Sequence, residues 1–148
     1  MKNLSDQQQH TVTQYMYLGL LPFLAGAIGP WIAPQYEPWL IDSFLFYSGL
    51  ILVFLAGALW ALALFTDLPT RPPVIHGAIG FSLWPLVSYF FSPFYAALWL
   101  IAGFLGLLFW EKCYVNSLYP AWYHKLRHKI TFIVVACHML TVWNVIHA

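Results

Sequence analysis

Five apolar segments, joined by short loops, take up most of this 148-residue chain. They cover residues 15–32, 43–65, 74–91, 94–110 and 130–147. Each approaches the ~20 residues that an α-helix needs to cross a ~30 Å hydrocarbon core. Charged residues make up only 7% of the chain, against about 25% in ordinary soluble domains. The sequence therefore predicts an all-α integral membrane protein, a bundle of five transmembrane helices.

The ends and turns of this pattern suggest one membrane domain. Residues 1–14 are polar and lack a clear periodicity, so we expect a short cytoplasmic tail before a single five-helix domain at 15–148. The turn Ser92-Pro93 is so short that the third and fourth segments must form an antiparallel hairpin. Small residues four apart predict faces on which helices pack closely inside the bundle: Ala25 and Gly29, Gly57 and Ala61, Ala102 and Gly106.

The positive charges all fall on one side of the segment pattern. Lysine and arginine occur before the first segment, in the second loop and in the fourth loop, and the other loops carry none. Because these residues concentrate in cytoplasmic loops, we expect the N-terminus in the cytoplasm and the C-terminus outside. Aromatic rings near the segment ends predict two interfacial belts: Trp31, Tyr36, Trp39, Tyr95 and Trp99 outside, and Tyr15, Tyr17, Trp110, Tyr114, Tyr119, Trp122 and Tyr123 inside.

His138 is the sharpest candidate for intramembrane chemistry. It lies eight residues into the fifth segment and so roughly 12 Å deep at 1.5 Å per residue. An ionisable side chain at that depth is a functional hypothesis, as a ligand or a proton relay. The alternative is a neutral histidine that is hydrogen-bonded inside the bundle. Both interpretations place His138 away from lipid.

Other polar side chains match His138 in position. Thr141 and Asn144 share its side of the fifth segment, and the depths of Ser82 and Ser88 in the parallel third segment match those of His138 and Asn144. We expect Ser82 to bond His138 and Ser88 to bond Asn144 between these two helices, where they would line a small polar cavity. The competing interpretation is that each serine bonds a carbonyl of its own helix.

A basic segment precedes the fifth apolar segment. Lys125, Arg127 and Lys129 alternate along it and Trp122 stands at its start. Such a segment predicts contact with anionic lipid headgroups on the cytoplasmic face, with the indole in the headgroup layer. The lipid bilayer is thus one expected partner, and the net charge of +1 gives no reason to expect nucleic acid.

Metal binding is a weaker alternative for the same segment. His124 and His128 are four apart and share a helical face, and His76 or Glu111 is the available third ligand. No phosphate-binding loop, HExxH or Cys-x-x-Cys motif is present, so the cofactor is unknown. No carboxylate falls clearly within the membrane, which disfavours a carboxylate-driven ion pump, and the two cysteines are expected to be free thiols.

Three motifs carry a resemblance to a known family. They are Leu20-Leu21-Pro22-Phe23, the stretch from Tyr47 to Trp60, and Pro120-Ala121-Trp122-Tyr123 followed by Leu126-Arg127. Together they resemble a family of small bacterial membrane proteins of unknown function that includes the eukaryotic transmembrane protein 69. The resemblance implies five helices and a bacterial inner membrane, and it supplies no reaction. The resemblance also implies a polar or basic residue in many relatives at the position where this chain has Leu59.

Three classes of function follow from these observations. The leading interpretation is a non-enzymatic inner-membrane protein that acts as an accessory or assembly partner of another membrane protein. The second is a small transporter or a cofactor- or proton-handling module centred on His138, with His76 as an entry group. The third is a lipid-modifying enzyme at the basic face, for which the missing carboxylate cluster is the main objection.

Overall fold

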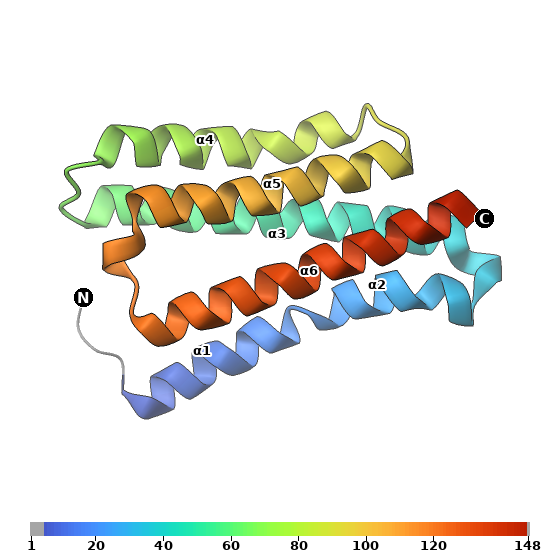
Figure 1. Ribbon diagram of the computed structural model, residues 1–148, viewed down its shortest axis with the longest axis horizontal. Helices are drawn as coiled ribbons and strands as arrows, with labels where there is room; N and C mark the ends of the chain where they lie inside the picture. Colours follow the sequence, from blue (N-terminus) through green and yellow to red (C-terminus); the bar gives the residue numbers. More distant parts are fainter. Residues whose placement is uncertain (1–4, 148) are drawn as a thin grey trace.

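The computed structural model describes residues 5–147, which form α-helices and two short 3-10 helices, with no strand in that range. Lys2, the lysine that precedes the first predicted segment, lies outside the described residues. Figure 1 shows the helices running side by side along the long axis. In chain order they are α1 (Asp6–Leu18), α2 (Leu21–Ile32), η1 (Pro34–Tyr36), α3 (Glu37–Phe65), α4 (Arg71–Ser88), α5 (Pro93–Tyr114), η2 (Asn116–Leu118) and α6 (Ala121–His147).

The all-α prediction is confirmed, and four spans are long and apolar enough to cross a membrane. These are Asp6–Ile32, Pro34–Phe65, Pro93–Tyr114 and Ala121–His147. The third predicted segment is the helix α4, which does not reach this apolarity. Its 18 residues are still about 27 Å long at 1.5 Å per residue. Helix α1 begins at one end of the bundle and α6 ends at the other (Figure 1).

The helix boundaries differ from the apolar pattern at three places. The polar stretch before Tyr15 is helical from Asp6, because Ser5 and Gln8 form a capping box in which each side chain bonds the other's backbone N–H. Pro22 starts α2 after a break at Gly19 and Leu20, so it sits in a first turn, where proline is tolerated, and does not kink a continuous helix. The basic segment belongs to α6, which is helical from Ala121.

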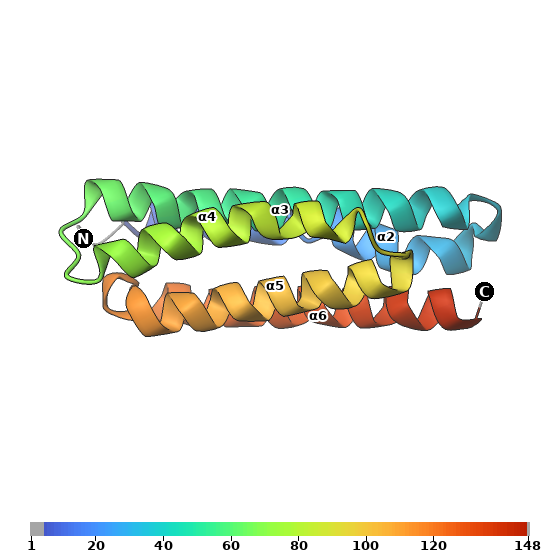
Figure 2. The same ribbon diagram turned by 90° about the horizontal axis from the view of Figure 1, so that it is seen from above.

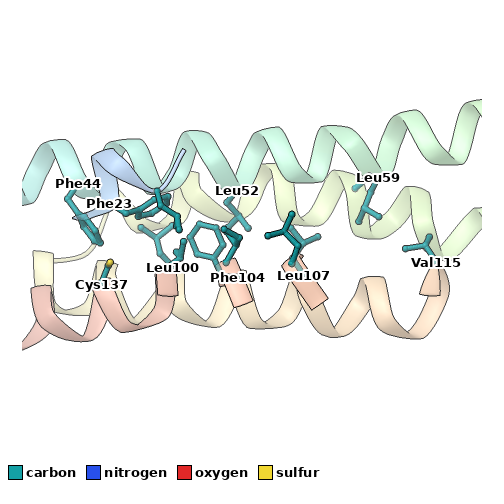
Figure 3. Close-up of a cluster of buried hydrophobic side chains, with 14 of the residues drawn as sticks. Phe23, Phe44, Leu52, Leu59, Leu100, Phe104, Leu107, Val115 and Cys137 are labelled. Atoms are coloured by element: carbon teal, nitrogen blue, oxygen red, sulfur yellow. The ribbon is translucent and has the colours of Figure 1, made fainter. Parts of the chain in front are cut away.

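The core is built from side chains of helices α2 to α6. Phe23 of α2, Phe44 of α3 and Phe104 of α5 are almost wholly buried and meet edge to face, and Leu52 and Leu100 continue the same layer (Figure 3). Leu59 is fully buried in the same core. An unpaired charge would be costly at that position.

Helices α4 and α5 are joined by a pair of tryptophans. The indole N–H of Trp84 donates to the carbonyl of Trp99, and that of Trp99 donates to the carbonyl of Trp84, both at 2.9 Å. The rings stack with centroids 4.2 Å apart and an interplanar angle of 9°. Trp99 was predicted to anchor the outer interface, but its polar atom is used between helices. Trp110 was predicted to anchor the inner interface, but its N–H likewise bonds another helix, donating to the carbonyl of Pro73 on α4.

The glycines separate into two groups by what surrounds them. A Cβ atom on Gly103 would lie 2.6 Å from Leu52 and 2.7 Å from Trp84, so this glycine permits close packing between helices. Gly29 and Gly106 similarly face Leu40 and Phe81. By contrast, a Cβ on Gly57 would meet nothing within 4 Å, and Ala61 is exposed. The prediction that Gly57 and Ala61 pack inside the bundle is therefore wrong.

Candidate functional site

A buried ion pair joins the end of α5 to the start of α6. Arg127 Nε donates to Glu111 Oε2 at 3.0 Å, and Nη2 donates to Oε1 at 3.4 Å. The remaining guanidinium nitrogen, Nη1, donates to Thr131 Oγ1 at 3.0 Å. Arg127 and Glu111 are only 3% and 5% exposed. Each charge is thus compensated by the other, as a buried charge requires.

This pair corrects two predictions from the sequence. Arg127 was expected to contact lipid headgroups, and Glu111 was counted among the carboxylates outside the membrane and as a possible metal ligand. The helical periodicity of α6 could have indicated that Arg127 is buried. Arg127, Thr131 and Val134 lie on the same face of the helix as His138, and this face is buried. Glu111 follows Phe104 and Leu107 in the same way. A charged residue in phase with a core stripe needs a buried partner, and these two residues provide it for each other.

Three phenylalanine rings surround the side chain of His138. It is fully buried, and its ring centroid lies 4.7 Å from that of Phe44, 5.6 Å from Phe104 and 6.0 Å from Phe23. Its Nδ1 is 2.8 Å from the carbonyl of Val134. A carbonyl only accepts, so Nδ1 carries the proton and Nε2 keeps a lone pair. Nε2 has no hydrogen-bond partner within residues 5–147.

The predicted bonds between the third and fifth segments are wrong. Helix α5 lies between α4 and α6 in Figure 1, and Figure 2 shows α5 and α6 overlapping below α4. Helix α4 packs against α3 and α5. Ser82 Oγ donates to the carbonyl of Ile79 at 2.8 Å, and Ser88 Oγ donates to that of Pro85 at 2.6 Å. The competing interpretation, that each serine bonds its own helix, is the observed one. Equal depth does not make two helices neighbours.

The other polar side chains on this face of α6 either bond a carbonyl of their own helix or have no partner among the described residues. Thr141 is buried, and its hydroxyl donates to the carbonyl of Cys137 at 3.1 Å. The Nδ2 atom of Asn144 is buried without a partner among the described residues. Thr141 and Asn144 share a helix with His138 as predicted, yet the structure places no side-chain hydrogen bond between His138 and either of them. Both cysteines are free, Cys113 exposed and Cys137 buried.

The histidines near the basic segment do not point toward a common position where a metal ion could bind. His124 Nε2 lies 2.9 Å from the carbonyl of Asn116, and His128 Nδ1 lies 2.8 Å from that of His124. Glu111 is committed to Arg127, and His76 is exposed on α4. In the described part of the chain, no three histidine, cysteine or carboxylate side chains gather as metal ligands would.

The exposed part of the basic segment faces outward. Lys125 and Lys129 are exposed, and the ammonium of Lys129 lies 5.4 Å from the ring centroid of Tyr17 on α1. Trp122 is half-buried against the core. Lys125, Lys129 and Trp122 are thus available at the surface, while Arg127 is withdrawn into the bundle.

Comparisons with known proteins identify the sequence family only. The family described as "Protein of unknown function (DUF3429)" matches residues 9–143. No curated protein and no solved structure gives a significant match. The match covers every helix from α2 to α5 and most of α1 and α6.

Proposed function

The chain belongs to the DUF3429 family, whose function is unknown, and on that premise we propose that it is a non-enzymatic accessory or assembly partner of another protein in the bacterial cytoplasmic membrane. The observation that carries the proposal is an outward-facing glycine on α3. Gly57 lies in the C-terminal half of this 29-residue helix, and a Cβ there would meet nothing within 4 Å. A partner helix would use that space.

Gly57 has no evident role within the bundle. Glycine in a helix interior costs roughly 0.5–1 kcal/mol relative to alanine, which suggests a compensating use. Gly80 on α4 is also open, but of these two glycines only Gly57 is followed four residues later by a second exposed small residue, Ala61. For Gly26, Gly77 and Gly103 the use is internal, because a Cβ there would collide with a neighbouring helix. Small residues also let two transmembrane helices approach closely. We therefore assign Gly57 to an external contact, within an exposed face formed by Val53, Gly57, Trp60 and Leu64.

The proposed orientation puts the N-terminus in the cytoplasm and the C-terminus outside, with α4 as a fifth crossing. Arg71 and Lys112 lie at the helix ends that share one side of the bundle with the start of α6. Glu37 and Asp42 lie at the start of α3, toward the other end. The cationic end would face the cytoplasm by the positive-inside rule. Lys125 and Lys129 would then meet anionic headgroups there.

The environment of His138 favours the assembly function over the alternative centred on this residue. A transporter or proton relay needs a polar path to its ionisable group. The neighbours of His138 are Phe23, Phe44 and Phe104, and His76 is exposed on α4, on the far side of α5. A buried neutral histidine in such a cage is a space-filling residue with one hydrogen bond.

The proposal predicts that Gly57→Leu releases a protein partner. The tagged protein is extracted in mild detergent, and co-purifying membrane proteins are quantified by mass spectrometry relative to the tagged chain. An added side chain that prevents close helix approach costs about 1–3 kcal/mol, so recovery of the partner should fall about fivefold or more.

The matched control is Ala136→Leu, which places the same side chain at an exposed position of α6. It should leave partner recovery unchanged. Equal recovery with Gly57→Leu and Ala136→Leu, or a wild-type chain that is recovered without any stoichiometric protein, contradicts the assembly function.

A further inference from the structure

A groove runs along the bundle between α1 and α3. It consists of two cavities of about 470 and 700 Å³ that share the lining residues Val12, Ala58 and Tyr123. Helix α1 contacts α6 and diverges from α3, whereas α2, after the break at Gly19 and Leu20, packs on both α3 and α6 (Figure 1). The break between α1 and α2 therefore leaves the space that we name the α1–α3 groove.

The groove changes from polar to apolar along its length. At the end of α3, its lining includes the hydroxyl groups of Thr66, Ser117 and Tyr119. Further along, it is lined by Ile51 and Phe54 among other apolar side chains. The distance along α3 from Thr66 to Ile51 is about 22 Å at 1.5 Å per residue. A polar group followed by a hydrocarbon chain matches this order and length.

The polar end offers hydrogen-bond donors. The phenol side chains of Tyr119 and Tyr123 line this end of the groove. Burial, reinforced by the negative charge of Glu111, raises the pKa of Tyr119 well above its ordinary value. This phenol therefore stays protonated and can donate to a phosphate or ester oxygen.

The groove opens sideways toward the membrane. Tyr15, Phe54 and Ala58 line it and are themselves exposed. For a chain that spans the bilayer, the medium outside this opening is lipid hydrocarbon and contains little water. Each cavity also has the volume of a small-molecule site, ~300–1,000 Å³. A helix is about 10–12 Å across with its side chains, so it is a poorer fit than a single chain.

We propose that the α1–α3 groove binds one membrane phospholipid, with an acyl chain along Ala58 and Phe54 and the phosphoglycerol head at Tyr119 and Tyr123. The buried ion pair of Arg127 and Glu111 lies beside the acyl chain, since Arg127 and Thr131 line the inner cavity. The site goes beyond the assembly function and does not depend on it, because Gly57 points about 100° away from Ala58 on α3.

Native mass spectrometry of the detergent-purified protein titrated with dioleoyl phosphatidylglycerol tests the site. The wild-type chain should bind one lipid with preference over further lipids. Ala58→Phe fills the groove where the two cavities join, and should reduce the one-lipid complex about tenfold or more. Ala136→Phe adds the same ring at an exposed position of α6 outside the groove, and should leave the complex intact.

Two further measurements keep the proposal testable if Ala58→Phe does not fold. Tyr123→Phe removes only a hydroxyl and should weaken the complex several-fold, by about 1 kcal/mol. A benzophenone side chain at Val12 of α1, which lines both cavities and lies off the Gly57 face, should cross-link a phospholipid in native membranes. A cross-link to a protein, no cross-link at all, or equal lipid binding by Tyr123→Phe, Ala136→Phe and wild type would overturn the lipid site.

Discussion

Glu111→Ala is expected to lower the free energy of unfolding by about 3–5 kcal/mol, because it leaves the guanidinium of Arg127 buried without its counter-charge. Arg127 is 3% exposed, and two of its three nitrogens donate to this carboxylate. The bond to Thr131 remains, but a hydroxyl carries no compensating charge. Arg127→Ala should cost a similar amount. The measurement is unfolding of the detergent-solubilised protein by titration with sodium dodecyl sulfate.

Two controls separate the ion pair from general effects of substitution. The double variant Glu111→Leu, Arg127→Met replaces both charges with apolar groups of similar size and should recover most of the loss, since well-packed apolar pairs often substitute for buried ion pairs. Lys125→Gln changes an exposed charge of the same segment and should shift stability by less than about 0.5 kcal/mol. A neutral Glu111→Ala would mean that the pair is solvated.

Gly103→Ala is expected to destabilise the bundle by about 1–3 kcal/mol through overpacking. The added Cβ would lie 2.7 Å from Trp84, whose indole is fixed by stacking on Trp99 and by the reciprocal N–H bonds. The ring must shift, and the stacked pair should lose its regular geometry. Thermal unfolding measures the stability, and near-ultraviolet circular dichroism reports the coupling between the two stacked indoles.

Gly80→Ala on α4 is the matched control for this substitution, since its Cβ would meet nothing within 4 Å. It should leave both the unfolding temperature and the tryptophan signal unchanged or raise stability slightly, as alanine is the better helix former. If Gly103→Ala and Gly80→Ala behave alike, the close approach of α3, α4 and α5 at Gly103 is absent in solution.

The sequence predicts the helices better than their neighbours. Hydropathy locates the segments because burial in lipid requires long apolar runs. It misses the start of α1 at Asp6, where the helix is polar and is stabilised by the capping box of Ser5 and Gln8. It also cannot give the lateral order of helices, so Ser82 and His138 match in depth yet lie on either side of α5.

The candidate site was only partly predictable for a related reason. His138 is identified from depth alone, and its burial agrees with that reasoning. Arg127 was assigned to the surface because lysine and arginine next to a membrane usually meet headgroups. Its actual position depends on a pairing with Glu111 that is 16 residues away in sequence. Extending the core stripe of α6 back from His138 to Arg127 would have indicated the inward direction, but only the tertiary structure supplies the partner.

Reporter fusions at the C-terminus test the membrane arrangement most directly. Five crossings with the basic loops in the cytoplasm place the C-terminus outside, so an alkaline phosphatase fusion after α6 should be active and a fluorescent protein fusion dark. A fusion in the loop at Asp67, after α3, should give the reverse pattern. If α4 does not cross, the chain has four crossings and the C-terminus returns to the cytoplasm. A fluorescent, phosphatase-inactive C-terminal fusion would therefore contradict the five-helix account.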